Sequence, residues 1–148
     1  NLSQRRDEHD DLIKKIAKTS DKVDDEAGEL VKRLNEFETK NLSSDVTEHI
    51  PDQDIIFLKK EVSRYKSSLQ ILMFRKMKLL KFLKIDQKKQ DTDAIIDPVD
   101  LHLLRQNLKS LTKILDIDLP RLKKHIELLE AFSTKALKAK LNEDNKKS

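Results

Sequence analysis

Apolar residues recur in alternating steps of three and four along most of the chain, a spacing that places them on one side of an α-helix. The pattern predicts three long helices, over about residues 10–41, 53–86 and 98–141. The seam of the first consists of Ile13, Ile16, Ser20, Val23, Ala27, Leu30, Leu34 and Phe37. The second seam consists of Ile55, Leu58, Val62, Tyr65, Leu69, Leu72, Leu79 and Leu83, interrupted by Lys76, and the third begins with Leu101, Leu104, Leu108, Leu111 and Leu115.

Proline and aspartate mark where the second and third helices begin. Pro51 cannot continue a helix, and either Asp52 or Asp54 can cap the next one by accepting hydrogen bonds from its first free N–H groups. Asp97 suits the cap of the third helix, and Pro98 suits its first turn because a missing N–H costs nothing there. The polar tail, residues 142–148, is expected to fray.

Pro120 lies inside the third apolar stripe, where it removes one hydrogen bond and clashes with the carbonyl of Asp116. Apolar residues beyond the proline nevertheless fall in the same sector as those before it. They are Leu122, Ile126, Leu129 and Leu137, and Leu119, directly before the proline, falls in the same sector. This continuity favours one helix kinked at Pro120. The alternative is a turn at residues 116–118 followed by a fourth helix.

Joined by connections of about ten residues, three such helices fold back on one another most simply as an up-down-up antiparallel bundle. We therefore predict an all-α, coiled-coil-like single domain over residues 1–148. Composition agrees with this fold, because 39% of the residues are charged, only 4% are aromatic and there is one glycine. Strand hairpins and phosphate-binding loops would use more glycine than that.

Charge is distributed unevenly along the chain. Residues 1–50 hold 9 basic and 13 acidic side chains, whereas residues 51–97 and 98–148 each hold 11 basic and 7 acidic ones. An antiparallel hairpin of the first two helices would bring acidic side chains near basic ones, and so explain part of the positive charge within the fold. The acidic residues are Asp7, Glu8, Asp10 and Asp11, and the basic ones are Lys78, Lys81 and Lys84.

Between residues 71 and 85 the second helix carries more apolar side chains than one seam requires. At about 100° per residue, the additional ones lie on a second face, beside lysines. This candidate partner-binding face consists of Ile71, Phe74, Lys78, Lys81, Phe82 and Ile85. One interpretation is that other parts of the chain cover the face, and the favoured one is that it binds a helix of another protein. An anionic membrane surface is a third candidate, which the position of the segment inside a long helix disfavours.

A basic patch on the same helix supports a different class of function, since a positive stripe attracts phosphate groups without reading sequence. The patch consists of Arg75, Lys76, Lys84, Lys88 and Lys89. The sequence predicts no catalytic residues, cofactor or metal site. It has no cysteine, and its four histidines, His9, His49, His102 and His125, lack the spacing that places two ligands on one helical face.

These observations predict a non-enzymatic helical subunit or adaptor of a larger intracellular assembly, cytoplasmic or nuclear, that binds another protein's helix. A homo-oligomer fits the same surface. The alternative is a nuclear protein that contacts nucleic acid in RNA processing or chromatin through basic faces of the second and third helices. No stretch has the length and apolarity of a membrane span. The chain begins at Asn1, so we expect it to be a piece of a longer protein.

Overall fold

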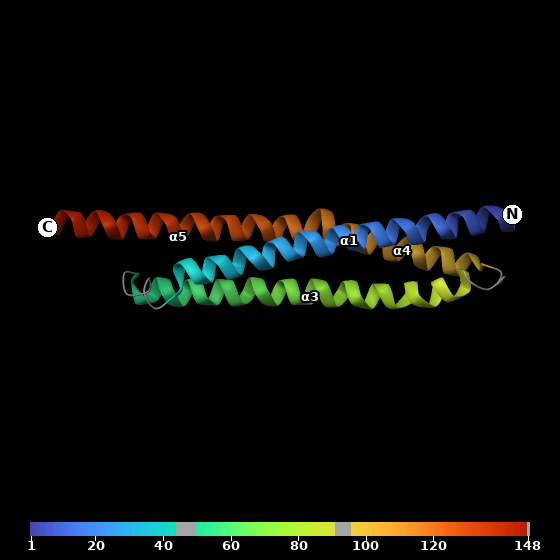
Figure 1. The fold of residues 1–148 in the computed structure, drawn as a ribbon, viewed down its shortest axis with the longest axis horizontal. Helices are drawn as coiled ribbons and strands as arrows, with labels where there is room; N and C mark the ends of the chain where they lie inside the picture. The colour runs from blue at the N-terminus through green and yellow to red at the C-terminus, as the bar shows by residue number, and fades with distance from the viewer. Residues whose placement is uncertain (44–49, 91–95, 148) are drawn as a thin grey trace. The chain divides into compact units, whose positions relative to one another are not determined.

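The computed structural model describes residues 1–43, 50–90 and 96–147, with the side chains of residues 82–90 and 136–147 outside that description. Over the described residues the protein is all-α and contains no strand, as predicted (Figure 1). Its elements are α1 (Leu2–Asn41), α3 (Asp52–Gln90), α4 (Pro98–Lys113), the π-helical segment η1 (Ile114–Asp118) and α5 (Leu119–Lys147).

The chain divides into two compact units. Unit 1 comprises residues 1–27 and 71–120, and unit 2 comprises residues 28–70 and 121–148. Each unit therefore contains one segment of α1, one of α3 and one from the third helical stretch. The early part of α1 shares unit 1 with the late part of α3, as the predicted antiparallel hairpin requires.

Side-chain pairs in unit 2 define the direction of its three segments. From Arg33–Glu130 to Asn41–Ser133 the residue numbers on α1 and α5 rise together, so these helices run parallel. The ring contacts Phe57–Phe132 and Tyr65–His125 join α3 to α5 with numbers that change in opposite directions. Unit 2 thus has the up-down-up arrangement that was predicted.

The predicted seams form the core. All eight seam positions of α1 are buried, and so are Leu58, Val62, Leu69 and Leu72 of α3. The core of unit 1 combines residues of α1 and α4 with Ile96, which precedes α4. Its buried members are Leu12, Ile13, Ile16, Ile96, Leu101, Leu104 and Leu111, with Leu79, Leu80 and Leu108 packed against them.

All three helices are longer than predicted. α1 begins at Leu2 rather than near residue 10, and Oδ1 of Asn1 accepts a hydrogen bond from the Ser3 N–H at 3.0 Å. The core face of α1 starts at His9, which is fully buried. α3 continues to Gln90, and α5 continues to Lys147 through the predicted frayed tail. Apolar periodicity could not locate these ends because they are polar segments rich in good helix formers.

The predicted cap of the third helix is confirmed, whereas that of the second is wrong. Oδ1 of Asp97 accepts a hydrogen bond from the Val99 N–H at 2.9 Å, and Pro98 occupies the first turn of α4. Asp52 and Asp54 lie inside the first turn of α3, and the Pro51 carbonyl accepts the bonds from the Asp54 and Ile55 N–H groups. Both carboxylates still favour the positive end of the helix dipole.

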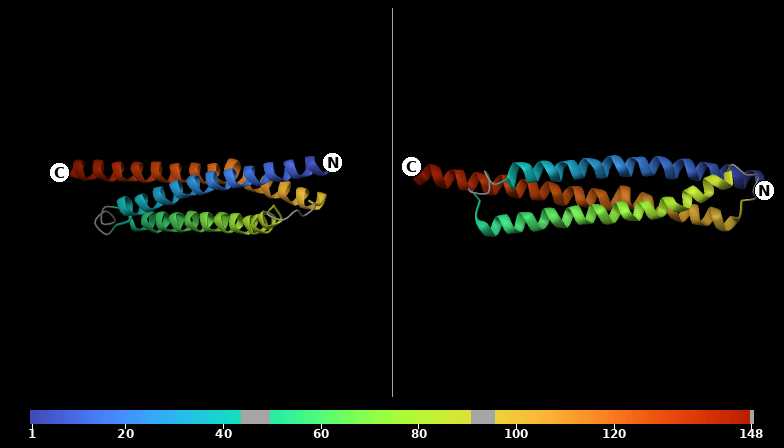
Figure 2. Two further views of the ribbon diagram at one scale, coloured as in Figure 1. Left: turned by 45° about the vertical axis from the view of Figure 1, so that its right-hand side comes forward. Right: turned by 60° about the horizontal axis from the view of Figure 1, so that its bottom comes forward.

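The chain remains helical across Pro120, and a π-helical turn replaces the turn of the four-helix alternative (Figure 2). Within this turn the Leu119 N–H donates to the carbonyl of Ile114, five residues earlier. The same two residues are consecutive buried positions, followed by Leu122. A five-residue step would turn an ordinary α-helix away from the core, so the wider π turn keeps Leu119 buried.

A candidate docking surface on α3 and α4

The unit 1 part of α3 has two different faces. Leu72 is buried in the core, whereas Ile71 and Phe74 are 54% and 56% exposed. Met77, which the sequence interpretation did not assign to this face, is 60% exposed. At about 100° per residue one helix cannot direct all of these side chains to the same neighbour. The exposed ridge formed by Ile71, Phe74 and Met77 is thus left without cover from the described residues of unit 1.

Lys78 connects this ridge to a charged region. Its ammonium nitrogen lies over the Phe74 ring, 4.7 Å from the ring centroid. At an exposed site, a cation held against an aromatic face contributes about 0.5–1 kcal/mol. The contact places a positive charge directly beside the largest apolar side chain of the ridge.

A groove lies between α3 and the α4–η1 segment within unit 1. Its volume is about 340 Å³. Leu79 and Ile114 supply apolar surface and Ser110 a hydroxyl group. The charged lining residues are Arg75, Lys78, Lys113 and Asp118. Lys78 therefore belongs both to the groove and to the margin of the ridge.

The positive charge of the groove is not neutralised within the described part of the chain. Arg75, Lys78 and Lys113 are exposed and form no ion pair with a described residue. Asp118, partly buried, is the one acidic side chain of the lining and pairs with none of them. The groove thus combines an apolar base with an excess of positive charge.

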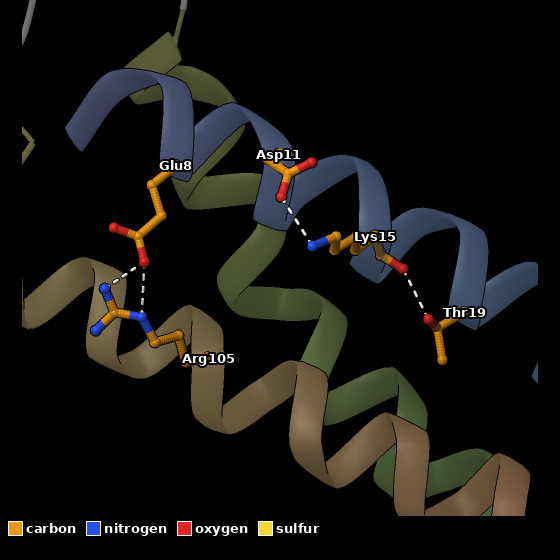
Figure 3. A network of polar contacts seen from close by, with 5 residues as sticks. All are labelled: Glu8, Asp11, Lys15, Thr19 and Arg105. Carbon is orange, nitrogen blue, oxygen red and sulfur yellow. Dashed lines mark hydrogen bonds and ion pairs between the residues drawn. The ribbon is translucent and has the colours of Figure 1, made fainter. Parts of the chain in front are cut away.

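The acidic residues of α1 do not supply partners in the way the sequence suggested. Nε and Nη2 of Arg105, on α4, donate hydrogen bonds to Oε1 of Glu8, with Nε 2.8 Å from that oxygen (Figure 3). Asp11 instead pairs with Lys15 on its own helix, at 2.9 Å. Glu8 and Asp11 thus pair with Arg105 and Lys15 rather than with Lys78 or Lys81 of α3, and the side chain of Lys84 lies outside the described residues.

Lys76 differs from Arg75, the other residue of the predicted basic patch whose side chain the structure describes. It occupies a seam position, is only 8% exposed and forms an ion pair with Asp24 of α1. A lysine on a helix seam can keep its stem among apolar side chains and extend its ammonium group to the rim. Lys76 is consequently a structural residue of unit 1 and does not contribute to an exposed patch.

Several predicted site residues cannot be placed on this surface. Lys81 is exposed on α3. The side chains of Phe82, Lys84, Ile85, Lys88 and Lys89 lie outside the described residues. The described surface accordingly rests on Ile71, Phe74, Arg75 and Lys78, with Met77, Lys113 and Ile114 added by the structure.

The polar contacts of unit 2 connect its helices to each other. Nη2 of Arg33 donates to Oε1 of Glu130 at 2.5 Å, and this hydrogen bond raises the pKa of the guanidinium against the opposing effect of burial. Lys66 of α3 pairs with Glu38 of α1. Each of these cations is matched by a carboxylate of a neighbouring helix.

Tyr65 and His9 are buried polar side chains without a place in the docking surface. Burial, and then its hydrogen bond to Glu61 at 2.7 Å, raises the pKa of Tyr65 to about 12. His9 is fully buried on the seam of α1, and neither ring nitrogen forms a hydrogen bond with a described residue. Its nearest ionic neighbour is Oδ1 of Asp10, 3.5 Å from Nδ1. The sequence interpretation missed this burial, although His9 precedes Ile13 by one helical turn.

Metal binding and membrane crossing were also considered for the described residues. They contain no group of three or more histidine, cysteine or acidic side chains placed to hold a metal ion. No helix among them is both long enough and apolar enough to pass through a bilayer. Comparison with protein-family models, curated proteins and solved structures finds no match to this chain.

Proposed function

We propose that the protein is a non-enzymatic interaction module that binds a helix of another protein on the exposed ridge of α3. One observation carries the proposal: Ile71 and Phe74 are each more than half exposed to solvent, on a helix whose opposite face is buried. Contiguous exposed apolar side chains bordered by charge are typical of interaction sites. The proposal assigns no reaction to the chain and makes it a subunit or adaptor of a larger assembly.

A helix is the partner that this geometry favours. Ile71, Phe74 and Lys78 lie along one side of α3 at steps of three and four residues, so a partner helix packed alongside α3 can contact all three. The partner would contact the ridge through its own apolar residues at the same spacing. Phe74 is the expected anchor because aromatic side chains dominate many protein interfaces.

The proposal is tested by selection from a displayed library of amphipathic helical peptides, with the full chain as the target. Peptides selected on the wild type are then measured against Phe74→Asp and, as a control matched in exposure, Leu128→Asp on α5 in unit 2. Leu128 is 60% exposed, close to the 56% of Phe74. We expect Phe74→Asp to abolish peptide binding with little change in melting temperature, and Leu128→Asp to preserve binding.

Three results would contradict the proposal. The selection could yield no peptides, or the selected peptides could bind Phe74→Asp as well as the wild type. Unfolding of the isolated Phe74→Asp variant would show that the ridge is core. Sedimentation of the wild type adds a further distinction, because self-association lost in Phe74→Asp would identify the partner as a second copy of the chain.

A further inference from the structure

We infer that the groove between α3 and α4–η1 selects an acidic amphipathic helix, whose carboxylates contact Arg75, Lys78 and Lys113 while its apolar side chains contact the ridge. This inference rests on the proposed function and adds the chemistry of the partner. It depends on three features of unit 1: the ridge, the charge of the groove, and the contact of Lys78 with Phe74.

The ridge and the groove are parts of one surface. Lys78 lines the groove and covers the ring of Phe74, and Arg75 follows Phe74 directly in the sequence. Residues 71–78 span about 10 Å at 1.5 Å per residue. A partner helix of about two turns or more therefore covers the length of the ridge with its apolar side and places its flanking residues over the groove.

The charges of the groove determine which flanking residues fit. A partner that covered Arg75, Lys78 and Lys113 without supplying anions would remove water from three cations, and Asp118 could compensate only one of them. Glutamate or aspartate on the partner converts this cost into attraction. A basic helix would meet like charges, which disfavour binding.

The apolar part of the surface argues for a peptide rather than a nucleic acid. Phosphate groups would satisfy the cations, and Phe74 could stack on a base. Ile71 and Met77, however, are aliphatic side chains without an aromatic face, and both are more than half exposed. Apolar side chains of a partner helix bury them favourably. Lys76, whose charge would strengthen a phosphate site, is instead buried on the seam of α3 and paired with Asp24 of α1.

The deciding experiment uses a helical peptide library with fixed apolar positions and flanking positions varied among Glu, Lys, Gln and Ser. The target is the full chain, either as the wild type or with Arg75→Glu and Lys113→Glu. Both residues are exposed and form no ion pair with described residues, so circular dichroism should show an unchanged fold. Lys18→Glu on α1, another exposed lysine of unit 1, is the control for charge reversal at a residue that does not line the groove.

Peptides selected on the wild type and on Lys18→Glu should be enriched in glutamate at their flanking positions. Peptides selected on the double variant should be enriched in lysine at the same positions. A selected acidic peptide should bind the double variant about tenfold more weakly at low salt, with a smaller difference at about 0.5 M salt. The affinity of the acidic peptide for a neutral variant, Arg75→Gln with Lys113→Gln, should lie between its affinities for the wild type and for the double variant.

The possible failures separate the two proposals. Peptides that require Phe74 but show no enrichment of glutamate would overturn the acidic partner and leave the proposed function intact. If no peptide is selected, or none depends on Phe74, both are wrong. A fluorescein-labelled single-stranded oligonucleotide serves as the competing probe. Tight oligonucleotide binding that is lost in the double charge variant but retained in Phe74→Asp would assign the groove to phosphate and also overturn the inference.

Discussion

The grooves of unit 1 and unit 2 differ in how their charges are balanced. In unit 2, a groove of about 210 Å³ between α1 and α5 is lined by two basic and two acidic side chains, and Arg33 and Glu130 pair across it. In unit 1, the groove is lined by three basic side chains and one acidic one, and none of them pairs with a described residue.

This difference shows that helix packing alone does not make a binding surface. Both units have the same three-segment plan and an apolar core. In unit 2 the carboxylates of Glu127 and Glu130 on α5 pair with Arg33 of α1. In unit 1 the corresponding segment, α4 with η1, adds Lys113 to the cations of α3 instead. This groove of unit 2 therefore has equal numbers of basic and acidic lining residues and one ion pair across it, whereas the groove of unit 1 has an excess of positive charge and no ion pair with a described residue.

The largest effect should come from the cores, and it tests whether the two units unfold separately. Leu104 in unit 1 and Leu34 in unit 2 are both fully buried, so we expect replacement of either by alanine to cost about 2–5 kcal/mol. Because α1 and α3 each contribute to both units, both variants should lower the midpoint of one cooperative transition in calorimetry. Two transitions, with only one displaced in each variant, would show that the units are independent.

Two lysine–carboxylate pairs provide the next comparison. Lys76 pairs with Asp24 in unit 1 and is nearly buried, whereas Lys66 pairs with Glu38 in unit 2 and is substantially exposed. Asp24→Ala should cost about 1–3 kcal/mol because it leaves a poorly hydrated ammonium group without its partner. Glu38→Ala should cost about 0–1 kcal/mol.

Chemical denaturation of both variants measures this difference. Lys76→Met is the informative control, because an apolar side chain of similar shape should preserve or increase the stability of unit 1. Equal losses from Asp24→Ala and Glu38→Ala would mean that burial of the lysine does not determine the strength of the pair.

Features that depend on residues within one helix could be predicted from the sequence, whereas features that depend on contacts between helices could not. Burial of Val23, Leu30 and Leu34 could be predicted because periodic apolar residues on one helix must face a neighbour, whichever neighbour it is. The cap at Asp97 was equally local. The exposed face containing Ile71 and Phe74 could also be recognised, since it lies opposite a complete seam on the same helix.

The missed features depend on contacts between helices. The pairing of Glu8 with Arg105, rather than with a lysine of α3, depends on how α4 is rotated about its axis. The same rotation brings Lys113 into the groove. The π turn before Pro120 was missed because periodicity assumes a uniform 3.6 residues per turn. The five-residue step from Ile114 to Leu119 within the π turn keeps both residues buried.

A smaller effect is expected from glycine on α1. Gly28, in unit 2, has an ordinary helical backbone, and a Cβ added there would meet no neighbouring atom within 4 Å. Gly28→Ala should therefore increase the free energy of unfolding by about 0.5–1 kcal/mol. Ala17→Gly, at an exposed position of α1 in unit 1, should decrease it by a similar amount. A loss of stability in Gly28→Ala would reveal a close approach at this residue.

A dependence of stability on alkaline pH is also expected to originate in unit 2. Tyr65 is the chain's only tyrosine, and burial together with its hydrogen bond to Glu61 raises its pKa to about 12. The folded protein thus favours the protonated phenol more strongly than the unfolded chain does. The resulting stabilisation is complete below about pH 10, the ordinary pKa of tyrosine, and is lost as the pH rises through the folded pKa.

Lysines also lose their protons in this range, so the measurement must be a difference between wild type and Tyr65→Phe. Denaturant unfolding at about pH 9 and about pH 11.5 should show that the advantage of the wild type over Tyr65→Phe shrinks at the higher pH. Absorbance of the phenolate reports the titration directly and should give a midpoint well above the ordinary value for tyrosine. If the difference between the two proteins is the same at both pH values, Tyr65 titrates as it does in the unfolded chain, and its burial has no consequence for the stability of unit 2.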